Sequence, residues 1–217
     1  MSNMYEWKHG RGSDNQPPSG FARLWPAPAS SRDGSSSVGA MGTNLTADVP
    51  APLLVTSGTE REVLAAFLDF HRGVVVRKAS GVSDDDARRR LVPSLTTLAG
   101  LVHHLTTVER EWFHRLLATP QPPPPVEEDD ESWRPGDDHA VADLLADYEQ
   151  ACARSRDNAA DFGLDDEVPH NLLGTVSLRW IYVHVIEETA RHAGHADILR
   201  ELTDGVTGVT GTEWSAR

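Results

Sequence analysis

Three histidines and two glutamates lie within fourteen residues near the end of the chain, in the stretch HVIEETARHAGHAD (184–197). Imidazole nitrogens and carboxylate oxygens are common ligands of divalent metals, and the same groups serve as general bases. On a helical wheel of about 100° per residue, His184, Glu188, His192 and His195 fall within about 80° of one another. The stretch therefore predicts a helix that gathers its ionisable groups on one face.

Apolar residues share this face, because Ile181, Val185 and Leu199 fall on the same arc of the wheel. The apolar side of an amphipathic helix faces the core, so we expect the ionisable groups to face inward as well. Burying such groups is costly unless each is paired or bound to a metal. The spacing leaves two interpretations open, a metal site and a buried hydrogen-bonded network without metal.

A single ion cannot contact the whole face, since its first and last histidines lie about 16 Å apart along the helix axis. Only neighbours at i, i+3 or i+4 can share one ion. The candidate pairs are His184 with Glu188, Glu188 with His192, and His192 with His195. A further ligand must come from another helix, where His104 shares its spacing with an apolar stripe, while His103 falls on a more polar face. We expect the other histidines His9, His114, His139 and His170 to lie in solvent.

Four long amphipathic segments would position these groups. Their periodicity predicts helices over about 59–79, 95–118, 138–162 and 177–203. Thr59 and Glu62 have the spacing of a capping box at the first helix, and Gly205 ends the last one. A few residues near Val168 could form a strand. The pattern predicts an all-α fold, a four-helix bundle over residues 51–208.

Other segments are predicted to lie outside the helices of the bundle. Residues 1–50 lack aliphatic periodicity and are expected to be disordered, and residues 209–217 are expected to fray. The stretch SDDDARRRL predicts a short capped helical turn. The stretch TPQPPPPVEEDDESWRPGDD combines prolines with carboxylates and predicts an exposed loop between the second and third helices.

Composition limits the partners. The formal net charge of −13 argues against nucleic acid and against anionic membrane surfaces. The sole cysteine, Cys152, excludes an intramolecular disulfide, and its helical spacing predicts core packing rather than reactivity. No stretch has the pattern of a signal peptide or a membrane span, so we expect a cytoplasmic protein. The sequence leaves open whether the chain forms a homodimer.

Two stretches carry a resemblance to a known family. LVHHLTTVEREWFHRLL (101–117) and SLRWIYVHVIEETARHAGHADILRELTDG (177–205) resemble the signature segments of the DinB-like superfamily. The most similar branch is actinobacterial and related to mycothiol-dependent transferases and maleylpyruvate isomerase. The resemblance covers about residues 59–205 and implies a four-helix bundle that holds a divalent metal ion, zinc or nickel, through three side chains.

The resemblance also implies roles for individual residues. It implies that His104, Glu188 and His192 are the metal ligands, with glutamate at position 188 where many members have histidine. His195 is then expected to contact a bound thiol cofactor or substrate, or to support the ligands. His184, one turn from Glu188, is expected to support that residue, and it stays open whether His184 replaces one of the ligands.

The implied activity is that of a transferase. It would activate a low-molecular-weight thiol such as mycothiol at the metal and conjugate it to an electrophilic small molecule. Only Lys8 and Lys78 of the 20 basic residues are lysines, a bias typical of the GC-rich genomes of actinobacteria. Two alternatives remain: a metal-assisted hydrolase, whose open position would hold water, and a metal-binding structural bundle without catalysis.

Overall fold

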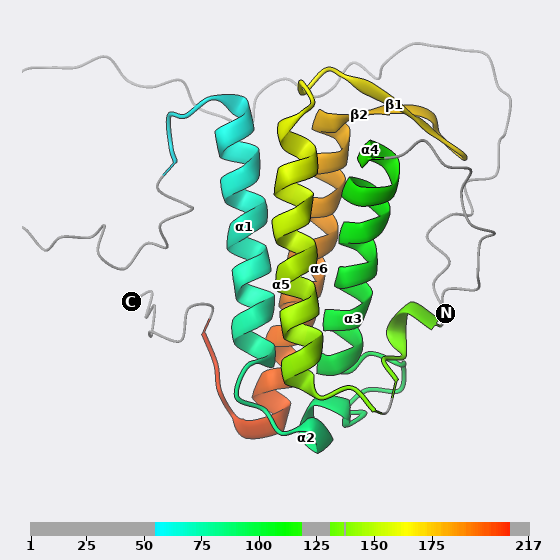
Figure 1. Ribbon diagram of the computed structural model, residues 1–217. Coiled ribbons are helices and arrows are strands. Elements are labelled where there is room, and N and C mark those ends of the chain that lie inside the picture. The colour runs from blue at the N-terminus through cyan, green and yellow to red at the C-terminus, as the bar shows by residue number, and fades with distance from the viewer. Residues whose placement is uncertain (1–54, 119–130, 137, 209–217) are drawn as a thin grey trace, which may run out of the picture. The chain divides into compact units, whose positions relative to one another are not determined.

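The computed structural model describes residues 55–118, 131–136 and 138–208. Its helices form a four-helix bundle, which confirms the predicted fold class (Figure 1). The long helices are α1 (Glu60–Ala79), α3 (Leu98–Glu109), α5 (Val141–Ala160) and α6 (Leu178–Asp204). The chain of α3 continues through η2 (Arg110–Arg115), a π-helix, into α4 (Leu116–Ala118). The segments predicted to be disordered or frayed, 1–50 and 209–217, lie outside the described residues.

The helix ends follow the local signals in the sequence. The Thr59 backbone N–H donates to Glu62 Oε2 at 2.7 Å, and the Glu62 N–H donates back to Thr59 Oγ1 at 3.4 Å, which completes the predicted capping box. Gly205 adopts a left-handed φ of 78° and ends α6 as predicted. The short helix α2 (Asp84–Arg88) is capped by Ser83.

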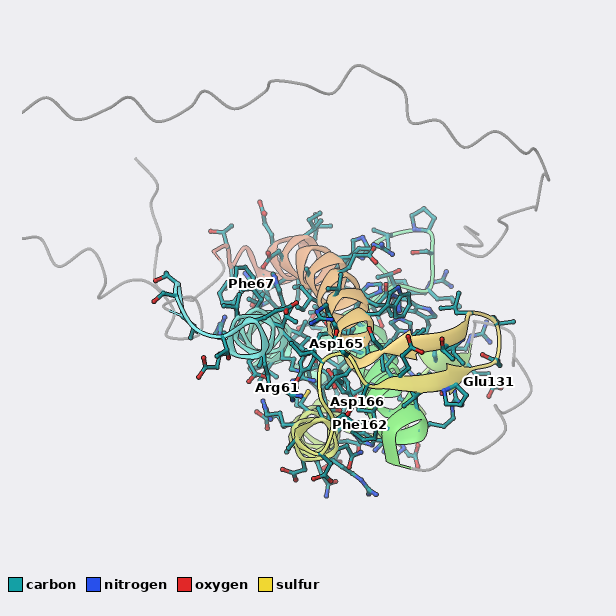
Figure 2. The ribbon with its side chains drawn as sticks, turned by 90° about the horizontal axis from the view of Figure 1, so that it is seen from above. Arg61, Phe67, Glu131, Phe162, Asp165 and Asp166 are labelled. Atoms are coloured by element: carbon teal, nitrogen blue, oxygen red, sulfur yellow. The ribbon has the colours of Figure 1, made fainter. Side chains whose placement is uncertain are left out.

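A β-hairpin joins α5 to α6, and the sequence predicted only part of it. Strands β1 (Glu167–His170) and β2 (Gly174–Ser177) pair antiparallel, with Val168 opposite Val176. The second strand is too short for alternation to show. Figure 2 shows the hairpin at one end of the bundle, where β1 packs against α4 and β2 against α6. At the same end Arg61 of α1 donates to Ala159 O of α5 at 3.0 Å.

The core contains most of the apolar residues that helical periodicity predicts. Cys152 is buried beside Tyr148, and burial raises the pKa of its thiol to about 12. Its burial confirms the predicted core packing. A thiol with so high a pKa stays protonated and unreactive near neutral pH. Phe67 of α1 shares the helical spacing of apolar residues, yet it is 46% exposed. The helix buries Arg72 and Lys78 instead.

The buried arginine forms an ion pair that the sequence did not predict. Arg72 Nε and Nη2 donate to the two carboxylate oxygens of Glu109 at 2.8 and 2.5 Å, and Nη1 donates to Asp69 at 2.9 Å. Glu109 is 1% exposed. Burial alone would lower the pKa of Arg72, but the charge and hydrogen bonds of Glu109 raise it. This pair links α1 to α3 through the centre of the bundle.

Candidate metal centre

Three predicted residues from two helices meet inside the bundle. His104 of α3 and His192 of α6 each direct Nε2 toward Glu188 Oε1, at 3.4 and 3.1 Å. One ligand atom from each of the three side chains lies within 4.8 Å of the others. In the described part of the chain this is the one group of three or more such residues that could hold a metal ion. Its members are mostly buried.

The spacing fits one divalent ion. Two ligand atoms on a tetrahedral zinc ion are about 3.3 Å apart, given bond lengths of about 2.0–2.2 Å, and the distances of 3.4 and 3.1 Å from the two Nε2 atoms to Glu188 Oε1 fall on either side of this value. Two imidazoles and one carboxylate form a ligand set typical of catalytic zinc, which leaves a fourth position open. Of the candidate pairs on α6, the structure brings Glu188 and His192 together with His104. Their role as ligands stays a prediction.

His104 is held from the side opposite the centre by a segment that the sequence assigned to an exposed loop. The short helix η3 (Glu131–Trp133) packs against α3. Ser132 Oγ lies 3.1 Å from His104 Nδ1, and the Trp133 ring stacks on the imidazole with 4.1 Å between centroids. A bond from Nδ1–H to Ser132 Oγ leaves the lone pair on Nε2, as a metal ligand requires.

Two features of α3 allow this contact. Gly100 has no side chain, and a Cβ there would lie 2.8 Å from the Trp133 carbonyl oxygen, so the glycine permits the close approach of η3. His103, predicted on the more polar face, is half-buried, and its Nδ1 lies 2.8 Å from the Ser132 carbonyl oxygen. Neither Ser132 nor Trp133 was predicted as part of the site. The loop prediction for this segment is corrected by these contacts for residues 131–133.

His192 is held from α6 itself. Its Nδ1 lies 3.2 Å from Nδ1 of His195, three residues further along the helix. If His192 presents Nε2 to a metal, its Nδ1–H donates to His195, whose own proton is then on Nε2. Burial and the neighbouring His192 lower the pKa of His195. His195 thus supports the orientation of His192, while its ring stays accessible from outside.

The carboxylate is favoured in its charged form even before any metal binds. Without a metal, Nε2–H of His104 and then of His192 donates to Glu188 and holds the pKa of that carboxyl well below its usual range, although burial acts in the opposite direction; a metal ion would take the place of these two protons. Arg191 lies 3.4 Å from Glu188 Oε2 and also pairs with Glu187. A charged carboxylate is the form that binds metal, so the arrangement is prepared for a cation.

The remaining histidines differ in part from the predictions. His139 is exposed as expected. His114 was expected in solvent, but it is half-buried and its Nε2 lies 3.0 Å from Ala151 O. His170 was also expected in solvent, yet its ring stacks on Trp112. His184 does not reach Glu188; its nearest carboxylate is Glu187 at 4.0 Å, and its ring contacts Trp112 and Trp180.

The four-helix bundle, which brings two histidines and one glutamate of α3 and α6 together, defines the class of protein: the fold is that of the DinB-like superfamily. Within it, the chain belongs to the mycothiol-S-transferase family, whose model matches residues 63–205. This match covers η2, the hairpin and all three residues of the cluster.

A solved structure supports the fold alone. A crystal structure described as a conserved protein of locus from Enterococcus faecalis is similar to this chain with a TM-score of 0.51 and 17% sequence identity. The similarity covers 69% of this chain and 100% of that one. A search of curated proteins returned no match. Within the described residues, no helix is both long and apolar enough to cross a membrane.

The support of His104 by η3 can be tested through metal affinity. Replacing Ser132 with alanine is expected to weaken zinc binding about 10- to 100-fold, the usual cost of losing a partner that orients a ligand. Competition with a chromogenic chelator measures the affinity. Ser155→Ala is the matched control, because Ser155 Oγ lies at the same 3.1 Å from His114 Nε2, away from the centre. Equal zinc affinity in both variants would show that Ser132 does not orient His104.

Proposed function

We propose that the chain is a divalent-metal-dependent transferase that conjugates mycothiol, or a similar low-molecular-weight thiol, to an electrophilic small molecule. The observation that carries this proposal is the convergence of His104, Glu188 and His192 in a chain of the mycothiol-S-transferase family. We assign these three side chains as the ligands of zinc or nickel. A divalent metal held there would lower the pKa of a bound thiol, so that the thiolate would be available near neutral pH.

The residues of the chain bind and orient around that chemistry. Ser132 and His195 hold the two ligand imidazoles, and Trp133 covers His104 and meets His192 edge-on at 5.1 Å between centroids. These rings exclude water from one side of the centre. The exposed ring of His195 lies on the same face of α6 as the ligands and is assigned to contact the bound thiol.

The thiol can be transferred by substitution at an alkyl halide or by addition to an activated alkene. With an alkyl halide, the thiolate sulfur forms a bond to carbon, the carbon–halogen bond breaks, and the halide leaves with the electron pair. With an activated alkene, sulfur adds to one carbon and the other carbon takes up the proton that the thiol released. Neither form needs an oxidant or a reductant.

Cobalt substitution tests the proposal directly. Thiolate bound to cobalt produces a strong charge-transfer band in the near ultraviolet, so adding mycothiol to the cobalt protein is expected to produce that band. Incubation with a fluorogenic alkyl bromide is expected to consume thiol in a metal-dependent reaction. Hydrolysis of ester or amide substrates without thiol would support a hydrolase instead, and a spectrum that ignores millimolar thiol would leave a bundle whose metal serves the fold.

A further inference from the structure

Four aromatic rings from three elements lie together near the hairpin end of the bundle. Trp112 of η2 is central: its ring lies 5.2 Å from that of His170, 5.2 Å from that of Trp180 and 4.5 Å from that of His184, measured between centroids. Trp180 and His184 also stack on each other at 5.0 Å. We call Trp112, His170, Trp180 and His184 the aromatic cluster. None of the four is among the three residues assigned to the metal.

The π-helix accounts for the place of the central ring. A π segment has more residues per turn than an α-helix, is rare, and occurs most often at functional sites. In η2 it lets two consecutive large residues, Trp112 and Phe113, both point inward with exposures of 8% and 1%. Phe113 packs on Tyr182 in the core, which leaves Trp112 for the aromatic cluster.

The described residues leave part of the aromatic cluster exposed to solvent. Trp180 is 40% exposed, and at the hairpin turn Leu172 and Leu173 are 69% and 51% exposed. Large apolar surface of this kind next to a site is typical of ligand contact. Trp180 packs against Trp112 and His184, and the rest of its surface is open to a ligand.

The two histidines add ring nitrogens that form no hydrogen bond within the described residues, apart from Nδ1 of His170. His170 Nδ1 accepts hydrogen bonds from the N–H groups of Leu172 and Leu173, both at 3.2 Å, so its proton lies on Nε2. Among the residues that the structure describes, none forms a hydrogen bond with His170 Nε2 or with a ring nitrogen of His184, although Glu187 Oε2 lies 4.0 Å from His184 Nδ1. The cluster thus combines apolar ring faces with ring nitrogens that can bond a ligand.

The cluster lies where the body of a thiol anchored at the metal would extend. On α6, His184 is one turn from Glu188 and Trp180 is two turns away, about 6 and 12 Å along the axis. An extended residue spans about 3.5 Å, and the cysteine side chain adds to this reach. Groups attached to a cysteine whose sulfur lay at the metal could therefore reach these rings.

From this arrangement we infer that the aromatic cluster is the subsite for the sugar and cyclitol rings of the thiol, an inference that rests on the proposed function. Mycothiol carries glucosamine and inositol rings on an acylated cysteine. Such rings offer C–H faces that pack on aromatic side chains and hydroxyl groups that bond imidazole nitrogens. A flat apolar electrophile would use the stacking alone and leave the ring nitrogens without partners, which is costly in a partly buried site.

The test compares mycothiol with N-acetylcysteine, which has the same reactive arm without the rings. In the wild-type protein the ratio of kcat/KM for mycothiol to that for N-acetylcysteine is expected to be high. Trp180→Ala is expected to lower this ratio about tenfold, the equivalent of roughly 1.4 kcal/mol. Ile198→Ala is the matched control, because Ile198 is an exposed apolar residue of the same helix, 58% exposed and far from the cluster. Its ratio is expected to stay unchanged.

Two outcomes overturn the inference: an unchanged ratio in Trp180→Ala, and an equal fall in both variants. If the ratio is unchanged and Trp180→Ala instead raises the KM of the electrophile, the cluster binds the electrophile and not the thiol. Calorimetry with the thiol-free glucosamine–inositol moiety separates this inference from the proposed function. Binding that weakens about tenfold in Trp180→Ala supports the subsite even if no transferase activity exists, and no binding to the wild type overturns it.

Discussion

Replacing Glu109 with alanine is expected to destabilise the fold by about 3–5 kcal/mol, the range for removing one partner of a buried ion pair. The change leaves Arg72, 5% exposed, with a buried charge that only Asp69 partly compensates. At about 2–4 °C per kcal/mol, the melting temperature should fall by roughly 6–20 °C. Denaturant titration and thermal melting measure both quantities.

An exposed ion pair beside the buried one provides the control. Arg110, the next residue along the chain, pairs with Asp147 at 2.5 Å, with side chains 52% and 40% exposed. Asp147→Ala is expected to cost less than about 1 kcal/mol, because solvent screens such a pair. The double replacement of Arg72 by methionine and Glu109 by leucine should recover most of the loss. Similar effects of Glu109→Ala and Asp147→Ala would show that burial does not set the energy of the Arg72–Glu109 pair.

Replacing His104 with alanine is expected to remove the metal from the protein. The remaining Glu188 and His192 lie four residues apart on one helix and offer two ligands, which is fewer than a stable zinc site requires. Elemental analysis should find about one divalent ion per wild-type chain and none in the variant. Since metal binds the folded state, free metal at about 100 times its Kd stabilises the wild type by about 2.7 kcal/mol. A chelator should therefore lower the melting temperature of the wild type and leave that of the variant unchanged.

The choice of control for this experiment follows from the structure. His103→Ala was the natural comparison on sequence grounds, but His103 contacts the Ser132 carbonyl oxygen and so helps to hold η3. His139, with a side chain 56% exposed, is the better control. Metal retained in His104→Ala, or lost in His139→Ala, would contradict the assignment of His104.

Helical periodicity was enough to predict the bundle and to bring into consideration the residues of α3 and α6 that cluster in the structure. His104, Glu188 and His192 could be selected because each shares its helix face with buried apolar residues such as Leu101, Leu105 and Val185. These signals are local: they depend on residues three or four positions apart. The choice among the candidate pairs came from the family resemblance, not from spacing.

The rest depends on contacts between distant segments, which periodicity does not report. Ser132 and Trp133 follow a proline-rich stretch whose composition predicts an exposed loop. Their own contacts with α3, near Gly100 and His104, appear only in the structure. Arg72 and Glu109 are charged residues at positions that would normally be assigned to the surface. Each is buried because the other is present, 37 residues away in the sequence. The π-helix likewise has no local sequence signal.

The burial of Cys152 has a consequence for a protein that works with electrophiles. Such molecules alkylate any accessible thiolate, including those of the enzyme itself. The sole sulfhydryl of this chain is 4% exposed and stays protonated. Under the proposed function, the catalyst would thus present no sulfhydryl of its own to the reagents that it disposes of. Its working lifetime would be set by unfolding rather than by covalent self-inactivation.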